Sequence, residues 1–312
     1  MGVTPVRKTA ALALTVLAFT ALASTAACSS DNGADAPSTD APTTNSAAIA
    51  LPVSPVTIAI LDPGSEPRAV VARTPAESDQ QVTLFTSSTI AQQIGNSPSQ
   101  DFSTPALTIP LTAATDPARG TTAVDLTLGA VTTPDGTLAS NLGPTEGSGA
   151  GLTTDASGAV TALSIDPAPD SPDVARSAVE QALNQAVYSA VPFPAEPIGV
   201  GAQWTVTLEV QSAIALRQVT TATLRSLTDG VATVDVSVTQ TPDNPVWTLP
   251  DGQGTLNIDS FVMTGQGSLT SDLSRPLPTG GTITVGGDQV YRDPNSNTIL
   301  RQNTQNTVTW TS

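Results

Sequence analysis

Beyond about residue 50, apolar and polar residues alternate with a period of two, in runs that end at Gly, Pro, Asp or Asn. Such alternation is typical of β-strands with one buried face, and stretches such as Pro134-Asp135-Gly136 favour tight turns. Because the connections are short, neighbouring strands should pair antiparallel. The pattern predicts strands over residues 56–61, 68–73, 81–87, 106–111, 123–131 and 159–165, and then over residues 203–211, 216–227, 231–240, 254–273, 282–291 and 298–310.

One segment departs from this period and has helical spacing. Ser171-Pro172-Asp173 is typical of a helix start, with Ser as the cap, Pro in the first helical position and Asp in the first turn. Small and apolar residues then form one broad face, and prolines 192 and 194 stop the helix. The opposite face carries Arg176, Glu180, Gln181, Asn184 and Gln185. We expect an amphipathic helix over about residues 172–191 that packs closely against a sheet.

These elements together predict a mainly β fold of the α+β class. We expect a large twisted antiparallel sheet, curled into a half-barrel or open barrel, with one amphipathic helix packed on or inside its concave side. No low-complexity stretch interrupts residues 51–312, which favours one β-rich exported domain. Two β-rich lobes joined by the helix are the alternative, because the length suffices for either arrangement.

The first 27 residues follow a different pattern. A basic start with Arg7 and Lys8 precedes an apolar run at residues 9–23 and then a stretch of small residues. This is the order of a secretory signal peptide, and the run is shorter than the roughly 20 residues that a membrane-spanning helix needs. The sequence therefore predicts export, with removal of residues 1–27.

The chain's only cysteine, Cys28, directly follows Thr25-Ala26-Ala27. This run resembles the lipobox of bacterial lipoproteins, although Thr25 stands where Leu is usual. The resemblance implies that Cys28 becomes the first mature residue and carries lipid, which would hold the protein on the outer face of the cell membrane. An ordinary cleavage site beside an incidental thiol is the alternative. The remainder of residues 28–50 is polar and rich in Pro, Thr, Ser and Ala, which predicts a disordered tether.

Charge and composition narrow the possible chemistry. Loss of Arg7 and Lys8 with the signal changes the formal net charge from −16 to −18 and leaves a mature chain without Lys or His. Phosphate-rich partners would be repelled, because they are bound through clustered Lys and Arg. A histidine base, a zinc ligand set, a Schiff-base lysine and a free catalytic thiol are all missing. We therefore expect no catalytic residues, cofactor, metal or nucleic-acid partner, and the 3% of aromatic residues disfavours a platform for stacking sugars or bases.

The most distinctive run is PAEPIGVGAQW at residues 194–204. It resembles a P-x-x-P-(I/V)-G-V-G-A-x-W motif of uncharacterised lipoproteins from actinobacteria and other bacteria, and the likeness extends over about half of the mature chain. Pro197 would hold an extended connection, Gly199 and Gly201 would permit unusual backbone angles or close approach, and Trp204 would anchor a strand in the core. The motif predicts a structural element, with a ligand-contacting mouth as the alternative.

Two classes of function remain. The favoured hypothesis is a membrane-anchored lipoprotein with a non-catalytic binding or interaction role towards proteins or polymer of the cell envelope. The alternative is a carrier of a lipid or other apolar ligand in a half-barrel cavity. It rests on an architecture similar to that of the lipid-carrying lipoproteins of mycobacteria and the outer-membrane lipoprotein carriers of other bacteria, and fold alone does not define function. An apolar cavity on the order of several hundred Å³ would favour the carrier, and a solid core the first hypothesis.

Overall fold

The computed structural model describes residues 48–76, 79–115, 123–296 and 298–312. The predicted signal peptide, Cys28 and the tether up to residue 47 lie outside the described residues. All described residues belong to one compact unit, Asp40–Ser312, and its first strand begins two residues before the predicted domain start. Within the described ranges, no helix combines the length and the hydropathy that crossing a membrane requires.

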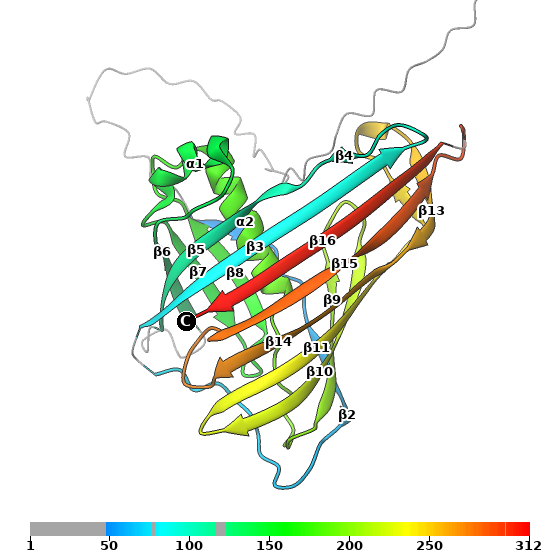
Figure 1. Ribbon diagram of the computed structural model, residues 1–312. Coiled ribbons are helices and arrows are strands. Elements are labelled where there is room, and N and C mark those ends of the chain that lie inside the picture. Colours follow the sequence, from blue (N-terminus) through cyan, green and yellow to red (C-terminus); the bar gives the residue numbers. More distant parts are fainter. Residues whose placement is uncertain (1–47, 77–78, 116–122, 297) are drawn as a thin grey trace, which may run out of the picture. The chain divides into compact units, whose positions relative to one another are not determined.

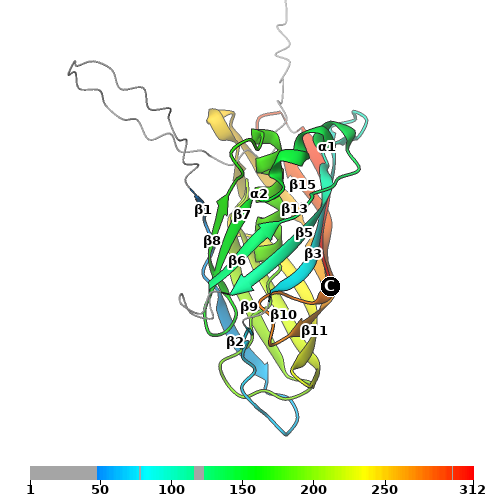
Figure 2. The same cartoon turned by 90° about the vertical axis from the view of Figure 1, so that its left-hand side faces the viewer.

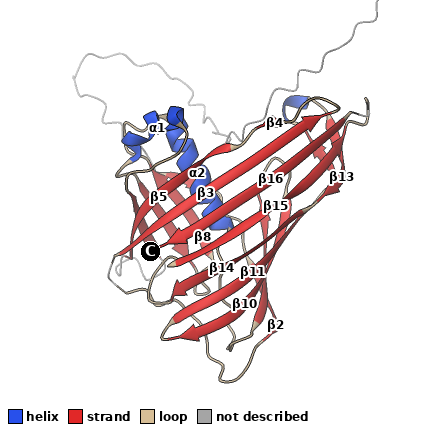
Figure 3. Cartoon of the chain, viewed as in Figure 1, coloured by secondary structure: helices blue, strands red, loops and turns tan. Residues whose placement is uncertain are grey.

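One large antiparallel sheet dominates this unit, as predicted (Figures 1 and 3). Its main path runs β1-β8-β7-β6-β5-β3-β16-β15-β14-β11-β10-β9-β2, while β4 pairs with β3, β12 with β13, and β13 with β15. The strands are β1 Ile49–Leu51, β2 Thr57–Asp62, β3 Gln80–Ile94, β4 Gln100–Asp101, β5 Thr104–Thr115, β6 Ala123–Leu128, β7 Gly149–Thr154, β8 Val160–Asp166, β9 Gln203–Val210, β10 Leu216–Thr228, β11 Val231–Pro242, β12 Val246–Thr248, β13 Thr255–Phe261, β14 Met263–Asp272, β15 Gly280–Arg292 and β16 Ile299–Thr311.

The two edges of the sheet are formed by strands that are consecutive in the sequence. β1 pairs with β8 at one edge, β2 pairs with β9 at the other, and β1 and β2 do not pair with each other. Only residues 52–56 connect them, a length that spans at most about 20 Å. The sheet therefore curls until its edges approach without closing into a barrel, and Figure 2 shows the blue segment running from β1 to β2.

Glycines allow β14 and β15 to approach closely. A Cβ atom at Gly267 would lie 2.1 Å from the backbone oxygen of Thr282, and one at Gly281 would lie 2.1 Å from that of Ser268. Gly281 also has φ +117°, a conformation that L side chains rarely adopt. These positions require glycine because the opposing backbone occupies the space of a side chain.

In the described part of the chain, two α-helices accompany the sheet, α1 (Gly136–Leu142) and α2 (Asp173–Tyr188), and α2 lies on its concave side (Figures 1 and 2). The buried face of α2 belongs to one apolar cluster with side chains from most of the long strands. Its buried helical members are Ala175, Val179, Ala182 and Leu183. The helix therefore covers apolar surface that the curved sheet would otherwise expose.

The predicted cap of α2 is wrong by one residue, and the helix ends earlier than predicted. Pro172, in an extended conformation, occupies the cap position without a side-chain bond, and the Ser171 hydroxyl instead donates to the backbone oxygen of Pro144 at 3.1 Å. At the other end, the Gln218 amide donates to the backbone oxygen of Tyr188 at 2.9 Å. This contact satisfies one of the carbonyl groups that a helix end leaves without a partner.

Three further predictions are corrected by the structure. Residues 68–73 form no strand and contribute only a bridge between Ala69 and Ile198. Residues 254–273 form two strands, β13 and β14, because the strand conformation is interrupted at Val262. The two strands pair with different halves of β15. The expected turn at residues 134–136 instead begins helix α1, whose first turn is capped by Asp135 Oδ1 accepting from the N–H of Leu138 at 2.6 Å.

The predicted polar face of α2 is only partly exposed. Glu180 lies on this face, and its carboxylate allows the energetic effect of burial to be tested. The Glu180 side chain is 13% exposed, and burial raises its pKa, while Arg176, with Nε at 3.7 Å, opposes the rise. A raised pKa means that the folded state binds the proton more tightly than the unfolded state, so stability is lost as pH rises through the folded pKa. We expect Glu180→Gln to raise the Tm slightly at pH 7 and to leave it nearly unchanged at pH 4, as measured by calorimetry. A lower Tm at pH 7 would show that the ion pair outweighs burial.

Candidate functional site

The glycine-containing motif at residues 194–204 leads into the start of β9. It is hydrogen-bonded to the segment that follows β2. The N–H of Gly199 donates to the backbone oxygen of Pro63 at 2.9 Å, and the N–H of Ser65 donates to that of Val200 at 2.9 Å. A Cβ atom at Gly199 would lie 1.8 Å from the Ser65 oxygen, so this contact requires glycine. Gly201 adopts φ +85°, and its N–H donates to the backbone oxygen of Leu224 at 2.8 Å.

Trp204, the last residue of the motif, lies in the core. Its side chain is fully buried, its indole Nε1–H donates to the backbone oxygen of Pro192 at 2.9 Å, and its ring centroid lies 5.8 Å from that of Phe193. Pro197 is exposed. Neither of the two pockets described next is lined by Pro197, Gly199, Gly201 or Trp204. The motif therefore acts in packing and backbone docking, which supports its structural interpretation.

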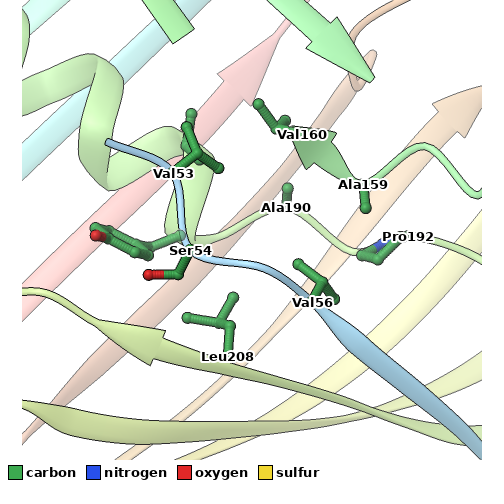
Figure 4. A pocket seen from close by; sticks show the side chains of 10 residues that line it. Val53, Ser54, Val56, Ala159, Val160, Ala190, Pro192 and Leu208 are labelled. Carbon is green, nitrogen blue, oxygen red and sulfur yellow. The ribbon is translucent and has the colours of Figure 1, made fainter. Parts of the chain in front are cut away.

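The first pocket lies at the seam between the two edges of the sheet (Figure 4). The connecting segment supplies Val53, Ser54 and Val56, and facing side chains include Val160 of β8 and Leu208 of β9. Its lining is mainly apolar, but its volume is only about 10 Å³. This is room for about one water molecule and no acyl chain.

The second pocket is a surface groove of about 420 Å³ across β14, β15 and β16, called the outer groove here. Alternate residues of these strands, such as Leu269, Ile283 and Val308, are buried in the core, so Gln266 and Gln305 point from the opposite, outer face. The groove is lined by Thr264, Gly265, Gln266, Thr284, Gly286, Gly287, Asn303, Thr304 and Gln305. Every lining residue is uncharged, and none has a large apolar side chain.

Strand register places the outer groove within parallel rows of small polar residues. One row consists of Ser237, Gln266, Thr284, Thr307 and Ser87. The next consists of Thr239, Thr264, Gly286, Gln305 and Thr89. With strands about 4.8 Å apart, each row is about 19 Å long. Gly286 has no side chain, so its position in the second row contributes only backbone atoms to the lining of the groove.

Hydrogen-bonding groups in the outer groove are partly paired and partly available. The hydroxyls of Thr284 and Thr307 are hydrogen-bonded to each other at 3.1 Å. At one end of the groove, the Asn303 side-chain amide donates to Asp288 Oδ1 at 2.7 Å. Within the described part of the chain, the side-chain amides of Gln266 and Gln305 have no hydrogen-bond partner. Each amide offers two donors and one acceptor oxygen, so the groove can bind a ligand through neutral hydrogen bonds.

Sequence reasoning singled out no residue of this groove. The available signal was a set of Thr, Gln and Asn residues at alternate positions of three strands, together with the pair Gly286 and Gly287. No group of three or more metal-ligating side chains occurs among the residues that the structure describes. No family model, curated protein or solved structure matches this chain.

Proposed function

We propose that this chain is an exported lipoprotein, held at the outer face of the cell membrane by lipid on Cys28, with a non-catalytic binding role in the cell envelope. The observation that carries this proposal is the distribution of surfaces on the sheet. Its concave side is filled by α2 and an apolar cluster, whereas its outer side presents a polar groove. A domain with a filled interior and a polar outer surface suits recognition of an external partner.

The packing of the domain supports the alternative function, a carrier of an apolar ligand, less well than the binding role. A cavity for a lipid chain needs on the order of several hundred Å³ of apolar volume. The apolar pocket at the seam has about 10 Å³, and the helix face that could line a cavity is buried against the sheet. A carrier function would therefore require the segment at residues 52–56 and α2 to move apart.

The sequence before the domain supports its placement near a membrane. Between Cys28 and Ile49 lies a polar segment of about 20 residues, whose composition predicts a tether. Such a tether would keep the domain close to the anchoring membrane. The mature chain also has no Lys or His, which supports a role without acid–base or covalent catalysis.

Cys28→Ala tests the anchor directly. We expect the unaltered chain in the membrane fraction of its host and the variant in the soluble or secreted fraction, a shift of at least roughly tenfold because one lipid anchor accounts for the attachment. Ser29→Ala is the matched control and should leave the distribution unchanged. A Cys28→Ala chain that stays with the membrane would refute the proposal. Mass spectrometry of the purified variant provides a second readout, since stoichiometric bound lipid would favour the carrier.

A further inference from the structure

We propose that the outer groove binds an uncharged, hydroxyl-rich polymer, that is, a neutral polysaccharide of the cell envelope. This inference rests on the proposed function, because an exported and anchored domain is in a position to meet such a polymer. It names the ligand class of the groove formed on β14, β15 and β16. Three properties of the groove support it: its charge, the type of its side chains and its geometry.

The charge of the groove indicates a neutral ligand. The whole chain has a formal net charge of −16, yet none of the nine residues that line the groove is charged. An anionic polymer would be repelled by the protein and would find no Lys or Arg in the lining to pair with. A cationic ligand would find no carboxylate there, and Asp288 at the end of the groove already accepts a hydrogen bond from Asn303.

The side chains indicate hydrogen bonding as the means of recognition. Protein–protein interfaces are usually anchored by buried Trp, Tyr, Arg or apolar side chains, and the lining contains none of these. It contains the free amides of Gln266 and Gln305 and the hydroxyls of Thr264 and Thr284. A sugar hydroxyl both donates and accepts hydrogen bonds, so a polysaccharide can pair with these groups.

The geometry suits an extended ligand held by several weak contacts. Gly286 must remain a glycine in this arrangement, because a Cβ atom there would lie 2.6 Å from the backbone oxygen of Thr304. Rows of polar side chains run across the strands on both sides of Gly286 for about 19 Å in total. A polymer with repeating hydroxyls can engage such rows in several registers, so it does not need the aromatic stacking that the composition disfavours.

The experiment is affinity electrophoresis of the purified full chain, kept in detergent, in native gels that contain a soluble polysaccharide. The neutral probes are dextran and arabinogalactan, and the anionic probe is alginate. We expect a neutral probe to retard the chain and alginate to leave it unretarded. Replacing Gln266→Ala and Gln305→Ala together should weaken binding to that probe roughly tenfold or more, because two hydrogen bonds of about 1 kcal/mol each are lost.

The matched control is the pair Gln81→Ala and Gln203→Ala. Both glutamines are exposed on the outer face of the same sheet, on β3 and β9, and neither lines the groove. This variant should bind as the unaltered chain does. Equal binding by the groove variant, retardation by alginate alone, or retardation by none of the probes would overturn the inference. If that happens while Cys28→Ala still releases the chain from the membrane, the inference fails and the proposed lipoprotein role remains.

Discussion

Replacing Gly281 by Ala is expected to destabilise the domain by more than about 3 kcal/mol, because a close backbone contact and an unusual backbone angle coincide at this residue. The new Cβ would lie 2.1 Å from the backbone oxygen of Ser268 and 2.7 Å from the Cα atom of Leu269, at φ +117°. Both neighbouring atoms belong to the backbone of β14, so relief requires β14 and β15 to separate. The measurement is equilibrium unfolding in urea, followed by tryptophan fluorescence.

Gly280→Ala, one residue earlier in the same strand, is the control. At this position the nearest atom to a new Cβ is the backbone oxygen of Trp310, at 4.0 Å, and φ lies outside the left-handed region. We expect the free energy of unfolding to change by less than about 1 kcal/mol, because the added methyl group would meet its nearest neighbour only at an ordinary van der Waals distance. If the two variants lost equal stability, the close approach of β14 and β15 would not be what makes Gly281 necessary.

The alternation of apolar and polar residues predicted β9, β10 and β11 well, because each has one apolar face and its turn residues are easily recognised. Residues 203–211, 216–227 and 231–240 correspond to β9, β10 and β11 within two residues, and Asp229-Gly230 forms a tight turn between the last two. Asp229 has φ +50° and Gly230 has φ +77°. In these strands, local preference and tertiary packing agree.

Prediction failed where buried positions are polar or where the pairing partner changes. β3 was expected over residues 81–87 but continues to Ile94, and its inner face includes buried Thr86 and Ser88, which break the apolar period. The expected strand over residues 254–273 would be twice as long as the upper end of the usual range of about 3–10 residues, which favours two strands over one. Edge strand β1 has three residues and forms through its pairing with β8, which its own sequence cannot reveal.

The outer groove could not be predicted from local sequence because strand register creates it. Gln266, Gly286 and Gln305 lie about 20 residues apart along the chain and become neighbours through the pairing of β14, β15 and β16. A slip of one residue in either pairing would turn the glutamines away from Gly286 and remove the groove.

Trp204→Ala is expected to cost about 3–5 kcal/mol, the range for truncating a large buried aromatic side chain. Trp204 is fully buried in the large apolar cluster that also contains the buried face of α2, so its removal leaves a cavity in the core. The change also removes the hydrogen bond from Nε1 to the backbone oxygen of Pro192 and the contact with the Phe193 ring. Thermal and urea unfolding followed by far-ultraviolet circular dichroism measure the loss without relying on the missing fluorophore.

Trp204→Phe separates the two contributions, because Phe keeps most of the apolar bulk and removes the hydrogen bond to Pro192. We expect it to cost about 1–3 kcal/mol, clearly less than Ala, as the Pro192 carbonyl loses its partner and a smaller void remains. If Phe cost as much as Ala, the hydrogen bond that joins the motif to the chain after α2 would be the dominant contribution. If both variants were as stable as the unaltered chain, Trp204 would not anchor the core, and the structural interpretation of the motif would have to be abandoned.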